Sequence, residues 1–231
     1  MNSASPSRSA APTRSRCFTP STCATATSTT TSSRGRTAPR RRPTASRATS
    51  TATAATAATS FSWTVGHVAG DLSLRRNNYS APDAVGNYHK SLADLYYIYD
   101  IDRDWQLHLS MSGQYGWTPL DSSEQFYISG ADAVRAFVQG EAGGRSGLLG
   151  TVELRRILGR SGLTATAFVD AGRIMGDGTK DLAGTGLGLI YQKSRDWYGK
   201  FDWATPLGCH YSESLGKDIT STAWLRLVKQ F

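Results

Sequence analysis

The chain has 231 residues, and its formal net charge of +8 comes from its first 60 residues, which contain nine arginines, no lysine and no acidic residue. The remaining 171 residues carry 17 basic and 18 acidic side chains, so they are close to neutral. This balance excludes a broad basic face on the folded part and argues against nucleic acid as a partner.

Residues 1–60 are dominated by Ser, Thr, Ala, Arg and Pro, and they contain no Leu, Ile or Val. Such a segment cannot bury enough apolar surface to offset the entropy of ordering its backbone, so we predict a disordered, low-complexity tail. An out-of-frame reading of a GC-rich gene, or a misassigned start, explains this composition better than a targeting or nucleic-acid-binding arm, whose arginines would be clustered or regularly repeated.

The second part of the chain, residues 61–231, alternates apolar and polar residues, which is typical of β-strands. In residues 105–118, for example, Trp105, Leu107 and Leu109 share one face, and Gln106 and His108 share the other. The pattern predicts eight strands and an all-β, antiparallel fold. In chain order they cover about residues 60–74, 91–101, 105–118, 146–157, 162–174, 183–192, 196–207 and 221–231.

These strands are long, and their aromatic residues lie near the ends of the apolar face. Soluble strands average about 5–6 residues, whereas a tilted membrane-spanning strand needs about 9–11. We therefore predict an outer-membrane β-barrel of a Gram-negative cell, and Phe231 resembles the terminal aromatic of an assembly signal. The expected lipid-facing residues are Trp105, Leu107, Leu109, Phe201 and Trp203, and the expected lumen-facing residues are Gln106, His108, Ser110, Lys200 and Asp202.

The motifs of common enzymes and cofactor sites are missing or have a simpler explanation. The glycines of GTGLG, residues 184–188, alternate within a strand and do not have the spacing of a dinucleotide fingerprint. The three cysteines and four histidines form no metal-ligand pattern. Glu153 and Arg155 share the polar face of one strand with Thr151, where a lumen charge network is the simplest account. We expect no enzyme activity, cofactor or metal.

Residues 120–156 and the segments TATAFVDAG, GTGLGLIY, YGKFDWATPL and WLRLVKQF together resemble the carboxy-terminal half of the ShlB/FhaC/HecB haemolysin secretion/activation proteins. These TpsB transporters act in two-partner secretion. The resemblance covers about residues 61–231 and keeps the family's order of motifs. It implies periplasmic POTRA domains followed by a 16-stranded barrel, whose sixth extracellular loop folds into the lumen.

The resemblance also assigns roles to particular residues. It implies that loop 129–147 folds inward and that its Arg135 is a latch held by Asp170, with a planar guanidinium suited to both carboxylate oxygens. The loop motif is Val134, Arg135, Ala136 and Phe137, and the strand motif is Phe168, Asp170 and Gly172. Ala136 stands where the family has Gly, and a positive φ there would strain the loop.

The resemblance implies a protein-transport pore, porin-like in its barrel, that passes an unfolded haemolysin- or haemagglutinin-like exoprotein. Its implied partners are that exoprotein, outer-membrane lipid and the barrel-assembly machinery. Eight strands correspond to half of the family's barrel, so we expect an open sheet with edges near Phe61 and at the last strand. We interpret the chain as a fragment that does not form a working pore by itself. Two alternatives remain open: a barrel-assembly insertase, and a receptor or adhesin that binds through its loops.

Overall fold

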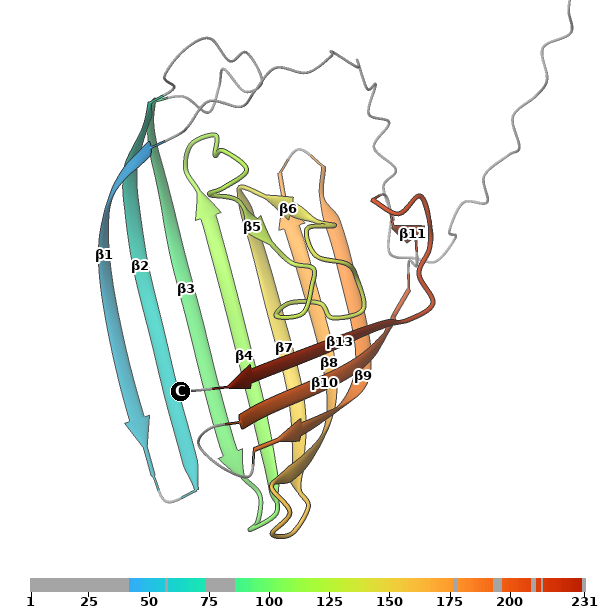
Figure 1. Ribbon diagram of the computed structural model, residues 1–231. Coiled ribbons are helices and arrows are strands. Elements are labelled where there is room, and N and C mark those ends of the chain that lie inside the picture. The colour runs from blue at the N-terminus through green and yellow to red at the C-terminus, as the bar shows by residue number, and fades with distance from the viewer. Residues whose placement is uncertain are drawn as a thin grey trace, which may run out of the picture.

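A computed structural model describes residues 42–56, 58–73, 86–176, 178–192, 197–208, 211–212 and 214–229. Nine strands of this part form one curved antiparallel sheet, in the order β1-β2-β3-β4-β7-β8-β9-β10-β13 (Figure 1). Their bounds are β1 Arg42–Ala55, β2 Thr59–Ser73, β3 Gly86–Asp100, β4 Trp105–Gly116, β7 Ser146–Ile157, β8 Leu163–Met175, β9 Lys180–Tyr191, β10 Trp197–Pro206 and β13 Thr222–Lys229.

Four short strands lie in the loops. β5 Phe126–Tyr127 pairs with β6 Gly143–Gly144, and β11 Tyr211–Ser212 pairs with β12 Lys217–Asp218. The described residues include no helix long and apolar enough to cross a membrane. The predicted all-β, antiparallel fold with an open sheet is confirmed, and each of the eight predicted strands corresponds to one strand of the large sheet.

The prediction for the first 60 residues is wrong for residues 42–55. These residues form β1, which pairs with β2 along its whole length, from Arg42 opposite Ser73 to Ala55 opposite Ser60. The strand needs no aliphatic core of its own, because β2 supplies a ladder of backbone hydrogen bonds and its β-branched threonines suit an extended backbone. Residues 1–41 of the predicted tail lie outside the described residues.

The two faces of the sheet differ in chemistry. Residues opposite one another in an antiparallel pair lie on the same face, so the register identifies each face across the whole sheet. The convex face carries large exposed apolar side chains: Trp63, Met111, Val152, Val169, Leu187, Trp203 and Leu225. On β10, Phe201 and Trp203 are 45% and 46% exposed, whereas Asp202 between them is buried, so the orientation predicted for this strand is confirmed.

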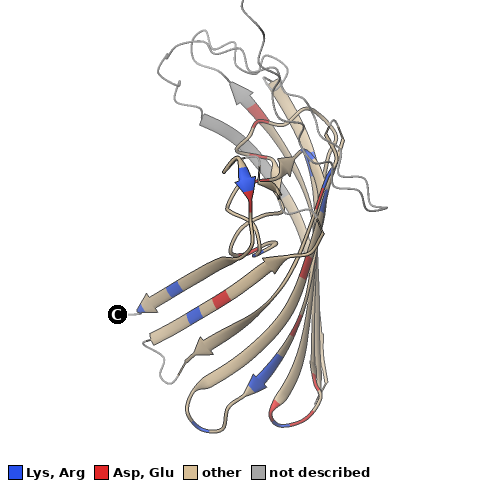
Figure 2. Ribbon diagram, turned by 90° about the vertical axis from the view of Figure 1, so that its right-hand side faces the viewer, with Lys and Arg blue, Asp and Glu red and all other residues tan. Residues whose placement is uncertain are grey.

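The sheet is open at both edges. Among the described residues, β1 pairs only with β2, and β13 pairs only with β10. One edge was expected at the strand near Phe61, but β1 covers that strand, so the edge lies one strand further out. β10 and β13 curl toward the concave side, and the loop between β4 and β7 fills the space that they partly enclose (Figures 1 and 2).

Candidate functional site

The loop between β4 and β7 brings Arg135 to the concave wall of the sheet. β5 and β6 close the base of this loop, so the inward-folded part is residues 128–142, which is shorter than the predicted loop 129–147. Near its beginning lies a tight turn: Gly130 has a φ of 121°, and the amide of Ala133 donates to the carbonyl of Gly130 at 3.1 Å. A residue with a side chain rarely adopts such a φ, so Gly130 permits this turn.

A second contact holds the part of the loop that precedes β5. The ammonium of Lys90, on the concave face of β3, lies 2.9 Å from both the backbone carbonyl and the side-chain carboxylate of Glu124. The side-chain amide of Gln114 on β4 donates from Nε2 to the same carbonyl at 3.0 Å. The loop is therefore fixed near its base as well as at Arg135.

Arg135 binds Asp170 of β8 through three hydrogen bonds. Its Nε donates to Oδ2 and its NH2 donates to Oδ1, both at 2.9 Å, and its backbone amide donates to Oδ2 at 3.2 Å. Thr151 of β7 also donates to Oδ1 of Asp170, at 2.9 Å. Arg135 is 4% exposed and Asp170 is 0% exposed. This two-pronged arrangement uses the planar fork of the guanidinium, which a lysine lacks.

Two further carboxylates approach the remaining nitrogen of the guanidinium. NH1 of Arg135 donates to Oε2 of Glu153 on β7 at 2.9 Å, and it lies 3.5 Å from Oδ1 of Asp202 on β10. Within the described ranges, no group of three or more His, Cys, Asp or Glu side chains is arranged to hold a metal ion. The carboxylates thus converge on an arginine from three different strands.

Neighbouring cations balance the charge of these carboxylates. Arg155 donates from Nε to Glu153 at 2.7 Å, and the ammonium of Lys200 lies 3.0 Å from Asp202. With Arg135 and Asp170, the cluster contains three basic and three acidic side chains, so its formal charges cancel. A neutral, well-paired cluster reduces the large penalty of burying charge away from water.

The guanidinium of Arg135 also lies over an aromatic ring. Its central carbon is 3.2 Å from the centroid of the Phe168 ring, a position in which the face of the ring attracts a cation. Burial alone would lower the pKa of Arg135, but the hydrogen bonds and charges of Asp170 and Glu153 raise it above its ordinary value. Arg135 therefore stays charged at any physiological pH.

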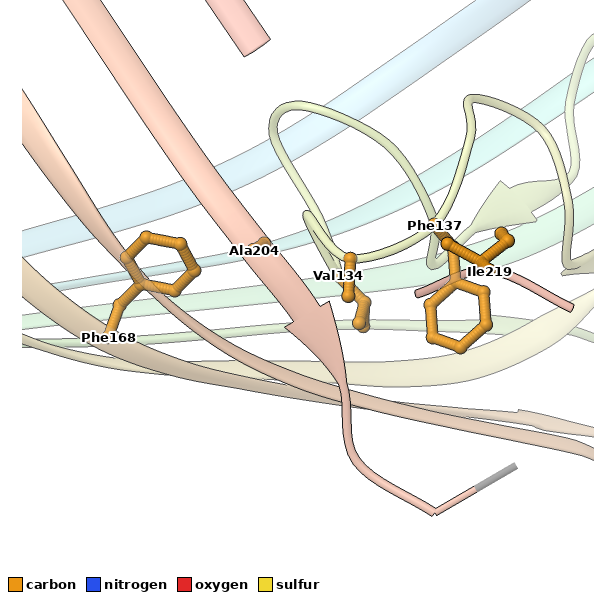
Figure 3. Packing of buried hydrophobic residues seen from close by; sticks show 6 residues of the cluster. Val134, Phe137, Phe168, Ala204 and Ile219 are labelled. Atoms are coloured by element: carbon orange, nitrogen blue, oxygen red, sulfur yellow. The ribbon is translucent and has the colours of Figure 1, made fainter. Parts of the chain in front are cut away.

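Apolar side chains of the loop pack beside the charge cluster. Val134 and Phe137 form a buried cluster with Phe168 and Ala204 of the wall and with Ile219, which precedes β13 (Figure 3). Val134, Arg135, Ala136 and Phe137 are all buried, as are Phe168 and Asp170 on the wall. The charged and the apolar contacts therefore hold the same short segment of the loop.

Glycines in the wall permit this close approach. A Cβ atom on Gly172 would lie 2.9 Å from Cβ of Ile128 in the loop, and one on Gly184 would lie 2.5 Å from Cβ of Ala136. A Cβ on Gly186 would lie 2.5 Å from the ring of Phe168. The glycines of GTGLG are therefore packing positions, as the structural interpretation of their spacing predicted.

The structure brings together nearly all of the residues that the sequence singled out. Arg135, Asp170, Glu153 and Arg155 lie in one cluster, and Val134, Ala136, Phe137, Phe168 and Gly172 form its packed surroundings. Phe231 lies outside the described residues. The alternation of apolar and polar residues placed Asp202 on the lumen side but did not connect it to Arg135. No signal in the sequence pointed to the contacts of Thr222 and Trp224 with the loop backbone.

Comparison with known proteins gives one family and two similar structures. The model of the family "Haemolysin secretion/activation protein ShlB/FhaC/HecB" matches residues 37–191, which include β1 to β9 and the loop with Arg135. No curated protein matches the chain.

Two solved structures share the fold: CdiB from Acinetobacter baumannii and CdiB from Escherichia coli, each with a TM-score of 0.64 and 19% identity. The first match covers 82% of this chain and 34% of that chain, and the second covers 78% and 35%. The chain thus spans about a third of the length of these structures.

Proposed function

The chain belongs to the ShlB/FhaC/HecB family of haemolysin secretion/activation proteins, and we propose that it forms part of a pore that passes an unfolded exoprotein by two-partner secretion. Members of this family are β-barrel proteins of the Gram-negative outer membrane, so the chain is an outer-membrane protein. The family assignment favours a transporter over the two alternatives that the sequence left open, an assembly insertase and an adhesin.

The observation that carries the proposal is the loop folded against the concave wall, with Arg135 buried among three carboxylates. In a pore, the concave wall faces the lumen, so the loop occupies part of the path of the exported chain. The role of Arg135 is then that of a latch. It holds the loop against the wall when the pore is idle and releases it when a substrate enters.

The contacts suit a latch because they are strong but confined to a short segment. Charge-assisted hydrogen bonds are about twice as strong as neutral ones, and the low dielectric of a buried site strengthens them further. The strands of the large sheet from β2 to β10, in contrast, each pair with a neighbouring strand on both sides and do not depend on the loop for this pairing. The loop can therefore leave while these strands remain paired.

The substrate that fits this pore is an extended polypeptide of the haemolysin or haemagglutinin type. The family is named for the secretion and activation of haemolysins. Folding of the substrate outside the cell supplies the direction of its export. The apolar convex face contacts membrane lipid. The barrel-assembly machinery inserts the sheet into the membrane, and Phe231 is part of the signal that this machinery recognises.

Export by cells that carry the variants Arg135→Ala, Asp170→Ala and the double variant tests the latch. Removing one partner of a buried ion pair leaves the other charge stranded, at a cost of about 3–5 kcal/mol. Each single variant is therefore expected to impair export, measured as exoprotein in the culture medium. The double variant strands neither charge of the pair, so it should lose much less than the sum of the two single variants.

Arg173→Ala is a matched control, because Arg173 also pairs with an aspartate, Asp181, but at an exposed position away from the loop. Its export is expected to be unchanged, because this pair lies on the convex face of the sheet, opposite to the loop. Full additivity of Arg135→Ala and Asp170→Ala would contradict the latch, as would an equal loss of export from Arg173→Ala.

A further inference from the structure

The arginine loop is held from a second side, by the strand β13. Trp224 donates from Nε1 to the backbone carbonyl of Arg135 at 2.7 Å, and Thr222 donates from Oγ1 to the carbonyl of Ala136 at 2.9 Å. Arg226 binds the carboxylate of Asp132 at 2.6–2.7 Å. Because these three residues alternate along β13, they all lie on its concave face.

The segment that leads into β13 covers the same loop. Ile219 packs against Val134 and Phe137, and the hydroxyl of Ser212 donates to Oε2 of Glu141 at 2.7 Å. Ser214 also hydrogen-bonds to this carboxylate. The contacts therefore join residues 212–226 to residues 132–141 of the arginine loop.

The position of β13 in the sheet makes these contacts important. Of the described strands, β13 pairs with β10 alone, and its convex residues Leu225 and Leu227 are 70% and 67% exposed. Its concave side chains, in contrast, reach the loop. An edge strand of eight residues is thus fixed by one neighbouring strand and by the loop that folds beneath it.

We propose that Trp224 is a positioning residue for Arg135, and that the arginine loop and β13 dock on the wall as one unit. The indole N–H fixes the carbonyl of Arg135 while Asp170 fixes the guanidinium and the amide of the same residue. Arg135 is thereby held between β8 and β13. Unseating the loop then loosens β13, and loosening β13 unseats the loop, because such coupling is reciprocal.

The location of this unit in a pore rests on the proposed function, but its test reads the position of the loop rather than export, so the two proposals can fail separately. The amide of Arg135, which donates to Asp170, is a direct reporter. Its hydrogen exchange in the full chain, folded in lipid vesicles, measures how often the loop leaves the wall.

Trp224→Phe keeps an aromatic ring and removes the indole N–H. Loss of one such hydrogen bond is expected to raise the exchange rate of the Arg135 amide roughly three- to tenfold. Asp170→Asn, which weakens the other side of the loop, is expected to raise the exchange of the β13 amides. In the double variant, the increase in the exchange rate of the Arg135 amide should be smaller than the product of the increases in the two single variants, since both changes release the same unit.

Two controls separate positioning from general loss of stability. Trp203→Phe changes a tryptophan on the convex face of the neighbouring strand. Leu225→Ala shortens an exposed side chain of β13 on the face that points away from the loop, and it leaves the hydrogen bonds of β13 to the loop intact. Neither should change exchange at Arg135 by more than about twofold, since neither removes a loop hydrogen bond. The proposal is overturned if Trp224→Phe leaves this exchange unchanged, if Leu225→Ala raises it equally, or if Asp170→Asn leaves the β13 amides unaffected.

Discussion

Ala136 and Gly184 form a complementary pair across the boundary between the loop and the wall. The methyl group of Ala136 in the loop occupies space that a side chain on residue 184 would need. Cβ of Ala136 and a Cβ built on Gly184 would be only 2.5 Å apart, which no packing tolerates. The methyl group in the loop is thus accommodated by the absence of a side chain on the wall.

This pairing predicts a rescue by exchange. Gly184→Ala should force the loop off the wall and lower the free energy of unfolding by about 1–3 kcal/mol, the usual effect of overpacking. Adding Ala136→Gly should restore most of that loss, because the next atoms are 3.3 and 3.5 Å from the new methyl group. Urea titration of the chain in lipid vesicles measures both changes.

Gly150→Ala is the control for a glycine in a strand, since a Cβ there would have only one neighbour within 4 Å, the carbonyl of Ser110 at 3.9 Å. It should change stability little. A double variant as unstable as Gly184→Ala alone would show that the two positions do not share this space.

At the scale of elements, the sequence predicted eight of the nine strands in the large sheet. Alternation of apolar and polar residues was sufficient, because each strand has one face toward lipid and one toward a polar interior. β1 was missed because the rule for disorder counts apolar residues, and β1 contains only Ala, Ser, Thr, Arg and Pro. The regular threonines at positions 49, 51 and 53 are the signal that could have revealed it.

The pairing of β1 with β2 predicts resistance to trypsin. Arg47 lies in the middle of the paired region, opposite Val68, so cleavage after it requires the strand to detach. In the folded chain this cleavage should be at least about tenfold slower than in urea, because a protease acts on the open form. Mass spectrometry of the fragments identifies the site.

Thr51→Pro supplies the comparison, since proline cannot donate a hydrogen bond to a ladder and should release β1. Cleavage after Arg47 should then accelerate in the folded variant. Equal rates in the folded and the urea-treated chain would instead return residues 42–55 to the predicted disordered tail.

The pairing of Arg135 with Asp170 was predictable, because the resemblance links the loop motif to the strand motif. Alternation also placed Asp170 on the polar face of its strand. The remaining contacts of the candidate site come from residues far along the chain: Thr222 and Trp224 follow their loop partners by 86 and 89 residues. Alternation placed Asp202 on the polar face but could not tell which loop it meets. The curl of β10 and β13 toward the concave side brings these two strands close to the loop (Figure 2).

At the scale of the whole molecule, the contrast between the two faces predicts how added charge is tolerated. Val152 lies at the middle of β7 on the convex face and is 49% exposed. Val152→Arg should lower stability in lipid vesicles by about 2–4 kcal/mol, the usual effect of arginine near the bilayer midplane.

Ser112→Arg is the matched change on the concave face, where residue 112 lies opposite Asp94 in the register. It should be tolerated, with a change below about 1 kcal/mol, because the new charge faces a carboxylate and water. Urea titration of both variants measures the difference, and equal losses would show that the convex face does not contact lipid.

The nine strands that the structure describes in the large sheet are an odd number, which fixes the relative direction of its two edge strands. Each neighbour in the sheet runs opposite to the last, so β1 and β13, the first and the ninth, point the same way. A direct seam between them would be parallel, with slanted hydrogen bonds unlike those of every other seam. A second copy placed by a two-fold axis along the pore would repeat that parallel seam twice. Bacterial barrels have even numbers of antiparallel strands, so a ring of this kind closes only when an odd number of further strands joins β13 to β1, whichever polypeptide supplies them.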